Sequence, residues 1–595
     1  MPGQSIRPSQ FITTYGPGSI IEGTDGPRVI RSLERSRVYA DAANRARVYD
    51  ITHKRLSETL LEGAGIVRLP TNAERGVPDS TPIYETVAFP SWSLCVAHRK
   101  LYQADAAARA GCPDCPQQQA AFVTAKAHRE AIRFVIACPE GHLDDVDWNF
   151  HVHRAGSNCR TRAFDWIGSG GALHATTLRC SNCGLHANLG SIFASEHKCW
   201  GRLPETGLHN RECSLPGLAA RMTQRGASNL RVVELLTALT ITEADAPLAQ
   251  LLQHTAIAGA LIGDPSITSR DQLLTLVRNL ARANLVPATD LLEVEYASEE
   301  AVTEALTAMR NRATPSTLTI RAEEFAALRR ASSSPTPTEV PGRQGGPPAL
   351  EVLPAEARIF ALRNGMRLRV TPVTRLQVTV VQRGYRRLIG KAADEAQLVG
   401  AEMHQDGRTW YPGIQLHGEG VFLELCSTTT GKVAPDPTAG IPEVTRWSAV
   451  PKDEESITRE QVDTRHPLFV WWHSFAHRLI NALSIDSGYS SSSIRERVFL
   501  SQNGLGEYEG GVLLYAVQPG GDGTLGGLTS LVPAFDRVLR RAMANIDACS
   551  NDPLCGEQHV GPDRKNGAAC YACLLVSETS CEFWNRGLDR NLLVM

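Results

Sequence analysis

The chain contains little lysine and no long hydrophobic run. Only eight of its 61 basic residues are lysine, and the other 53 are arginine. Arginine suits phosphate binding and buried ion pairs, but with so much alanine a GC-rich coding sequence is the simpler explanation. No segment approaches the roughly 18 apolar residues of a membrane-spanning helix, and the amino end lacks the apolar core of a secretory signal. We therefore expect a cytoplasmic protein that does not enter a membrane.

The chain is also nearly neutral overall, and it lacks a nucleotide-binding motif. The formal net charge over 595 residues is −2, so no overall basic field indicates nucleic-acid binding, and any such site must be a local patch. No G-x4-G-K-[S/T] motif occurs, because Cys426 stands where the first glycine would precede Gly431-Lys432. If the pathway requires ATP hydrolysis, we expect another chain to supply it.

Cysteine, by contrast, is abundant and clustered. Nine of the 15 cysteines lie between Cys95 and Cys213 and five between Cys549 and Cys581, which leaves Cys426 alone. A C-x2-C turn places two thiolates on one side of a tight loop, where a tetrahedral zinc ion can join them. In a reducing compartment such clusters favour metal over disulfides. We therefore expect two to four structural Zn²⁺ ions.

The first cysteine block predicts two quartets and a looser third set. The spacing C-x2-C-x15-C-x13-C predicts a closed four-sulfur site at Cys180, Cys183, Cys199 and Cys213. The spacing C-x2-H-x13-C-x2-C predicts a second site at Cys95, His98, Cys112 and Cys115, although His98 could instead be a surface residue. A third ion is possible at Cys138, His142 and Cys159, with His151 and His153 nearby. A core histidine beside a buried thiol explains this third set equally well.

The second block offers five thiolates for four positions. They are Cys549, Cys555, Cys570, Cys573 and Cys581. The Cys570/Cys573 turn is included in any assignment, but spacing does not decide which of the other three drops out. No candidate site shows an open fourth position with a glutamate base nearby, so structural zinc is favoured over catalytic zinc.

A histidine pair is the main candidate for chemistry. His473 and His477 are four residues apart, on one face of an expected helix. They could bind a metal, although no glutamate follows the first histidine as in H-E-x-x-H hydrolases. Together with Asp522 in a Gly-rich turn, they form a possible functional cluster of a metal-dependent nuclease. The simpler alternative is that both histidines pack an aromatic helix against a sheet.

The order of segments predicts an α+β, multidomain chain in which zinc stabilises the modules. We expect an all-helical insertion and a C-terminal α/β zinc-binding domain. The expected segments are a strand and loop region (1–90), a Cys/His module (91–214), a helical region (215–332), a flexible linker (333–350), a β-rich segment (351–460) and the C-terminal domain (461–595). Helices are expected at 230–239, 272–283, 468–483 and 531–546, and strands at 376–381, 421–425 and 511–517.

Several motifs resemble a known family. The C-terminal motifs His473-Ser-Phe-Ala-His477, Gly488-Tyr-Ser490, Gly523-Thr-Leu-Gly-Gly527 and Cys570-Tyr-Ala-Cys573 resemble the zinc-binding domain of MrfA-like superfamily 2 helicases. The motifs Tyr15-Gly-Pro-Gly18 and Gly418-Glu-Gly-Val-Phe422 narrow the resemblance to the DrmB family of the bacterial DISARM anti-phage system.

This resemblance implies a non-catalytic subunit that pairs with a DrmA-like superfamily 2 helicase and engages DNA, preferentially with single-stranded ends. Two other functions remain open at this point. One is the nuclease built on His473 and His477. The other is a scaffold that contacts the helicase and never touches DNA.

Overall fold

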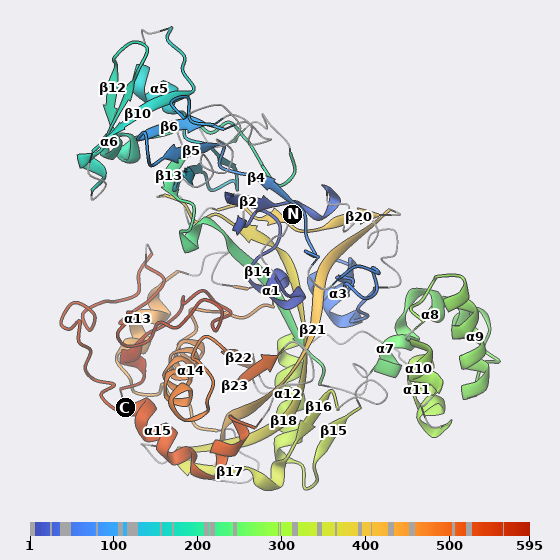
Figure 1. Ribbon diagram of the computed structural model, residues 1–595. Helices are drawn as coiled ribbons and strands as arrows, with labels where there is room; N and C mark the ends of the chain where they lie inside the picture. The colour runs from blue at the N-terminus through green and yellow to red at the C-terminus, as the bar shows by residue number, and fades with distance from the viewer. Residues whose placement is uncertain are drawn as a thin grey trace. The chain divides into compact units, whose positions relative to one another are not determined.

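A computed structural model of the chain describes residues 6–594 with internal gaps. The gaps are residues 24–25, 36–48, 79–80, 105–110, 116–128, 155–157, 169–171, 208–212, 215–219, 242–246, 289, 296, 298, 312–318, 342–347, 363–365, 391–395, 406, 427–433, 452–456, 459, 503–505, 519–525 and 563. Helices and strands occur in comparable proportions over several sheets (Figure 1), which confirms the α+β class. The chain divides into two compact units, and each unit gathers segments that are far apart in sequence.

Unit 1 comprises Met1–Tyr49, Val67–Leu236 and Val381–Ile414. Its cysteine-rich part is an antiparallel sheet in the order β12 (His186–Asn188), β11 (Thr177–Cys180), β10 (Ala163–Ile167), β6 (Lys100–Gln103), β5 (Trp92–Cys95), β7 (Arg129–Ala131). Two smaller sheets are β1 (Ile20–Gly23), β2 (Gly26–Ile30), β4 (Thr86–Ala88) and β13 (Arg221–Gln224), β8 (Phe134–Ala137), β9 (Leu143–Asp144). Trp92, Trp148 and Phe164 belong to a buried apolar cluster among these short strands, and metal sites at the loops would add cross-links to it.

Unit 2 comprises Asp50–Ile66, Thr237–Val380 and Gln415–Met595. Its sheet runs in the order β15 (Thr338–Val340), β16 (Leu350–Val352), β18 (Arg367–Arg386), β21 (Arg408–Cys426), β23 (Tyr508–Gln518), β22 (Ile494–Gln502), and the long strands β18 and β21 contribute residues to both units. Helix α14 (Pro467–Asp486) packs against β22, β23 and α15 (Phe535–Met543) (Figure 1). Trp471, Trp472 and Phe475 of α14 are buried in the main core.

The expected strands at 376–381, 421–425 and 511–517 lie inside β18, β21 and β23, and the expected helix at 468–483 lies inside α14. The helix expected at 230–239 is wrong, because this segment forms strand β14 (Val232–Leu239), which pairs with β18. Five of its residues are buried, including four in succession from Leu236 to Leu239. A strand covered on both faces has a continuous apolar run, which periodicity alone does not distinguish from a buried helix.

The helical insertion therefore begins after β14. Its helices are α7 (Pro247–Gln253), α8 (Thr255–Gly263), α9 (Arg270–Arg282), α10 (Asp290–Glu295), α11 (Glu299–Asn311) and α12 (Ile320–Ser333). Helices α7–α11 share a core of their own, with Leu252, Leu273 and Val277 at its centre. Ser269 begins α9 with a capping box that it closes with Gln272. Residues 342–347 of the expected linker lie outside the described residues, whereas residues 338–340 form β15.

The remaining regular elements are α1 (Pro8–Thr13), α3 (Lys54–Leu60), β3 (Gly65–Arg68), α5 (Trp148–His153), α6 (Leu189–Ala194), β17 (Arg358–Ala361), β19 (Val399–Gly400), β20 (Met403–Gln405) and α13 (Glu443–Ala449). Within the described part of the chain, every helix is too short or too polar to cross a membrane.

Candidate metal centres

Four groups of cysteine and histidine place their ligand atoms within 4.8 Å of one another in the described residues. Site A is Cys95, His98, Cys112 and Cys115. Site B is Cys138, His142, Cys199 and Cys213. Site C is His153, Cys159, Cys180 and Cys183. Site D is Cys549, Cys555, Cys570 and Cys573. Each group offers three or four sulfurs and at most one imidazole, which is the donor set of a closed structural zinc site.

Site A brings together the quartet that its spacing grouped. Strands β5 and β6 form a hairpin. Cys95 ends β5, and His98 lies in the turn that follows. His98 Nδ1 lies 3.5 Å from Cys95 Sγ and 3.3 Å from Cys115 Sγ, and the two sulfurs are 3.8 Å apart. Sulfur atoms bound to one zinc ion at 2.3 Å lie about 3.8 Å apart. His98 is exposed, and its Nδ1 lies at a distance from the sulfurs that suits a shared metal ion.

Sites B and C correct the expected four-sulfur quartet. Cys180 and Cys183 lie in site C, whereas Cys199 and Cys213 lie in site B, so these four residues do not share one ion. The looser third set is divided in the same way: Cys138 and His142 belong to site B, and Cys159 belongs to site C. His153, also named with that looser set, joins site C, and His151 instead contacts His197.

Strand pairing explains this division. Cys180 pairs with Phe164 across β11 and β10, so the chain just before β10 delivers Cys159 to within 3.7 Å of Cys180 Sγ. The segment between Cys199 and β13 is tied elsewhere, because Arg221 of β13 pairs with Ala137 of β8, next to Cys138. Cys199 Sγ is thus 3.6 Å from Cys138 Sγ and 3.4 Å from His142 Nδ1. Tertiary register, which spacing does not reveal, selects the partners.

Site D contains four of the five C-terminal cysteines and leaves out Cys581. Cys549 Sγ lies 3.5 Å from Cys570 Sγ, and Cys555 Sγ lies 3.7 Å from Cys573 Sγ. Cys581 belongs to a different cluster. The four sulfurs of site D are supplied by two loops, and the Cys570/Cys573 turn is closed by a 3.1 Å backbone hydrogen bond from Cys573 N–H to the Cys570 carbonyl.

Backbone amides favour the thiolate at the first cysteine of two C-x2-C turns, Cys570-Tyr-Ala-Cys573 and Cys180-Ser-Asn-Cys183. Burial raises the pKa of Cys570, but the Ala572 N–H and the side chains of Cys549 and Asn551 outweigh it and lower the pKa to about 7. Burial acts the same way on Cys180, and donors that include the Cys183 backbone N–H lower its pKa to about 7. Because the thiolate is the zinc-binding form, these turns favour the ionised ligand near neutral pH.

The histidine pair of the alternative nuclease is buried. His473 and His477 lie on α14 with no exposed surface, beside Glu496 of β22 and Cys581, which are buried as well. A phosphodiester cannot reach imidazoles in this position, so the geometry does not support the nuclease. Asp522 lies outside the described residues. Sequence reasoning missed Glu496, since no local motif marks it.

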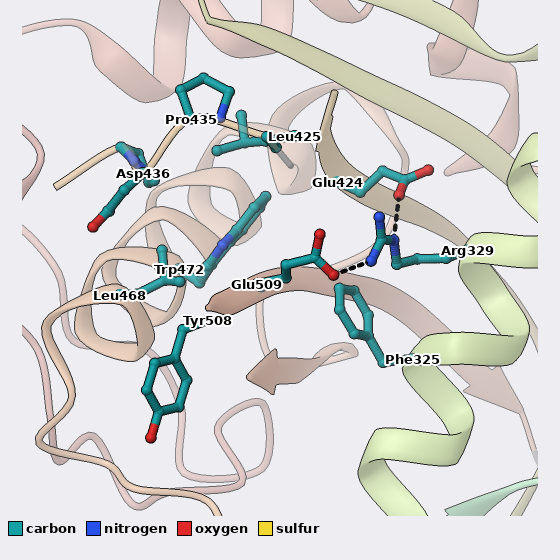
Figure 2. Close-up of a pocket in the computed structure, with 13 residues that line it drawn as sticks. Phe325, Arg329, Glu424, Leu425, Pro435, Asp436, Leu468, Trp472, Tyr508 and Glu509 are labelled. Carbon is teal, nitrogen blue, oxygen red and sulfur yellow. Dashed lines mark hydrogen bonds and ion pairs between the residues drawn. The ribbon is translucent and has the colours of Figure 1, made fainter. Parts of the chain in front are cut away.

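Unit 2 also contains a pocket lined by charged and aromatic side chains (Figure 2). Its charged groups are used in contacts with one another, because Arg329 Nε lies 3.2 Å from Glu424 and Arg329 Nη1 contacts Glu509. Asp436 accepts hydrogen bonds from the N–H and hydroxyl of Thr438. The pocket is therefore lined by a structural ion-pair network.

Family models match two parts of the chain. Residues 475–574 match the MrfA Zn-binding domain, and residues 7–232 match a domain of unknown function, DUF8724. The first match contains Cys549, Cys555, Cys570 and Cys573 of site D. Together with the four Cys/His groups, it supports structural zinc ions as the cofactors. The chain thus contains a segment similar to the MrfA Zn-binding domain and four Cys/His groups suited to structural zinc.

The expected resemblance to DrmB is confirmed. The chain is 28% identical over 518 residues to the DISARM protein DrmB of Bacillus paralicheniformis, and the alignment covers 81% of this chain and 82% of that protein. Among solved structures, the crystal structure of the DUF1998 helicase MrfA bound to DNA aligns with 34% of this chain at 12% identity and a TM-score of 0.17. This chain covers only 21% of that helicase.

Proposed function

We propose that this chain is a non-catalytic, zinc-stabilised subunit of a bacterial DISARM-type anti-phage complex. It binds a DrmA-like superfamily 2 helicase in the cytoplasm and helps to hold DNA. The observation that carries this proposal is the similarity to DrmB, which extends over four-fifths of both chains. The MrfA Zn-binding domain supports it, because that domain takes its name from a helicase.

Exposed arginines beside site C support the DNA-binding part of the proposal. Arg154 follows the ligand His153, Arg160 follows the ligand Cys159, and Arg162 lies two residues further. All three are exposed, and none forms an ion pair with another described residue. Loops fixed by metal can present such guanidinium groups to phosphates without losing much conformational freedom.

A charge-matched pair of variants tests this surface. We expect Arg160→Ala/Arg162→Ala to weaken binding of a duplex with single-stranded ends by about tenfold, because two phosphate contacts are lost. The slope of log K against log salt should become shallower by about two. The control is Arg278→Ala/Arg282→Ala, which removes the same charge from the exposed face of α9 and should bind DNA normally. Equal binding by both variants in gel-shift titrations would contradict the assigned surface.

Co-purification with the helicase separates the remaining alternatives. Under our proposal, the chain co-purifies with the helicase and increases the affinity of the complex for DNA. A scaffold would co-purify without changing that affinity. A nuclease would cleave DNA in the presence of Mg²⁺ or Mn²⁺ without the helicase, and cleavage would disappear in His473→Ala. We expect no cleavage, since both histidines are buried.

A further inference from the structure

The four side chains that meet beneath α14 come from three separate segments. Helix α14 supplies His473 and His477, strand β22 supplies Glu496, and the segment after the site D turn supplies Cys581. His473 Nε2 lies 2.9 Å from Glu496 Oε1 and 3.2 Å from Cys581 Sγ, and His477 Nε2 lies 3.3 Å from Glu496 Oε1. Nitrogen, oxygen and sulfur ligands of one tetrahedral zinc ion are about 3.3 to 3.7 Å apart, so the spacing is close to that of a ligand set.

The second nitrogen of each imidazole fixes its protonation. His473 Nδ1 lies 3.1 Å from the Gly587 carbonyl oxygen, and His477 Nδ1 lies 2.9 Å from the Leu574 carbonyl oxygen. A carbonyl can only accept, so both Nδ1 atoms carry a proton, and in the neutral form of each ring the lone pair lies at Nε2. Both lone pairs then face the same carboxylate oxygen. Metal-binding histidines are oriented in this way, with the outer N–H donated to a carbonyl.

The sulfur and the carboxylate are also arranged as ligands. Cys581 Sγ accepts backbone N–H groups of Phe583 at 3.3 Å and Asn585 at 3.2 Å, and these donors offset part of the burial that raises the pKa of its thiol. Glu496 Oε2 is buried and has no hydrogen-bond partner in the described residues. Two anions and two neutral imidazoles carry a charge of about −2, which a divalent cation neutralises. Without a metal ion, the same contacts require protons on the Nε2 atoms or on the Cys581 sulfur.

We propose that His473, His477, Glu496 and Cys581 hold a fifth, structural zinc ion. The Nε2 atoms, one carboxylate oxygen and the thiolate are its ligands, and the Cys581 thiol releases its proton when the ion binds. Zinc accepts this mixture of nitrogen, oxygen and sulfur donors. Four buried protein ligands leave no position for a substrate, so the ion is structural.

The ion connects elements that site D alone does not join. It links α14 and β22 to the segment that follows the Cys570/Cys573 turn, and the Leu574 carbonyl next to that turn holds the His477 ring. The family model for the MrfA Zn-binding domain ends at residue 574, before Cys581. The fifth ion is therefore distinct from the ion expected at site D.

Anomalous diffraction from crystals of the full-length chain tests the proposal without any substitution. Data collected on both sides of the zinc absorption edge should show a zinc peak bonded to His473, His477, Glu496 and Cys581, in addition to peaks at sites A to D. Zinc peaks at the four other sites without one here would overturn the proposal. A peak that belongs to another metal would overturn the assignment of zinc.

Zinc content measured by elemental analysis gives a second test. Cys581→Ser should hold one zinc ion fewer per chain than the unmodified protein, since a serine hydroxyl is a poor zinc ligand. The matched control is Cys426→Ser, which replaces a cysteine outside all five clusters and should keep the full zinc content. If both variants keep the same zinc content while remaining folded, Cys581 is not a ligand.

Discussion

Gly18, within the Tyr15-Gly-Pro-Gly18 motif, occupies a position that fits only glycine. Its φ is +77°, and a Cβ at this position would lie 2.6 Å from the ring of Tyr385. The motif is also fixed through its carbonyl groups, because Gln382 Nε2 donates to Tyr15 and Arg231 Nε donates to Pro17. The motif therefore has a structural role, because it packs and hydrogen-bonds against Gln382 and Tyr385 of β18.

We expect Gly18→Ala to destabilise unit 1 by about 3 kcal/mol, the sum of left-handed backbone strain and overpacking against a buried ring. Gly63→Ala is the control, since Gly63 has a similar φ of +85° but open space around its Cβ position, and it should cost only about 1 kcal/mol. The midpoints of urea unfolding measure both. Equal losses would show that Tyr385 does not restrict position 18.

At the scale of elements, strand register decides which cysteines share an ion. Cys180 and Cys199 belong to different sites because β11 pairs with β10 whereas β13 pairs with β8. We therefore expect Cys180→Ser/Cys199→Ser to lose two zinc ions per chain in elemental analysis. The grouping inferred from spacing predicts the loss of one ion, because both cysteines would then belong to one site. A loss of one ion in the folded double variant would contradict the structure.

A buried ion network joins α12 to β22. Arg497 of β22 contacts Glu324 of α12 and lies 3.1 Å from both Glu460 and Glu582. Arg321 of α12 contacts the same Glu460 and lies 2.7 Å from Glu582. The guanidinium groups keep the pKa of Glu460 below its ordinary value, against the opposing effect of burial. This carboxylate therefore stabilises the fold above its unfolded pKa and loses that contribution as pH falls.

We expect Arg497→Met to destabilise the chain by about 3 to 5 kcal/mol, because it leaves buried carboxylates without their cation. Arg495→Met on the same strand is the control, since Arg495 is only partly buried, and it should cost less than about 1 kcal/mol. Urea unfolding of both variants measures the difference. A small loss for Arg497→Met would show that the network is not needed for stability.

Local patterns predicted elements better than they predicted sites. Helices α9 and α14 follow from apolar periodicity and clear ends, such as the Ser269 cap and Pro467 in the first turn. Strand β14 was predicted as a helix because its burial on both faces removes the alternation that marks a strand. Site A was predictable since a single hairpin and one nearby loop supply its ligands. Sites B and C were not, because their ligands meet only after separate sheets form.

At the scale of the whole molecule, family motifs that are far apart in sequence converge on one carboxylate. Glu419 of the Gly418-Glu-Gly-Val-Phe422 motif accepts a 2.9 Å hydrogen bond from the Tyr489 hydroxyl. It also accepts the Leu528 N–H at 3.0 Å, directly after the Gly523-Thr-Leu-Gly-Gly527 motif. The resemblance therefore rests on residues that build the fold of unit 2. The sequence did not reveal this contact, because its partners are 70 and 109 residues away.

The account depends on metal ions that cross-link short strands and loops at sites A to D. Native mass spectrometry of the full-length chain, purified without chelator, tests this claim most directly. The expected mass exceeds that of the polypeptide by at least four zinc ions, and removal of zinc should abolish the folded charge-state distribution. A chain that carries no metal and still shows the compact distribution of a folded protein would contradict the account.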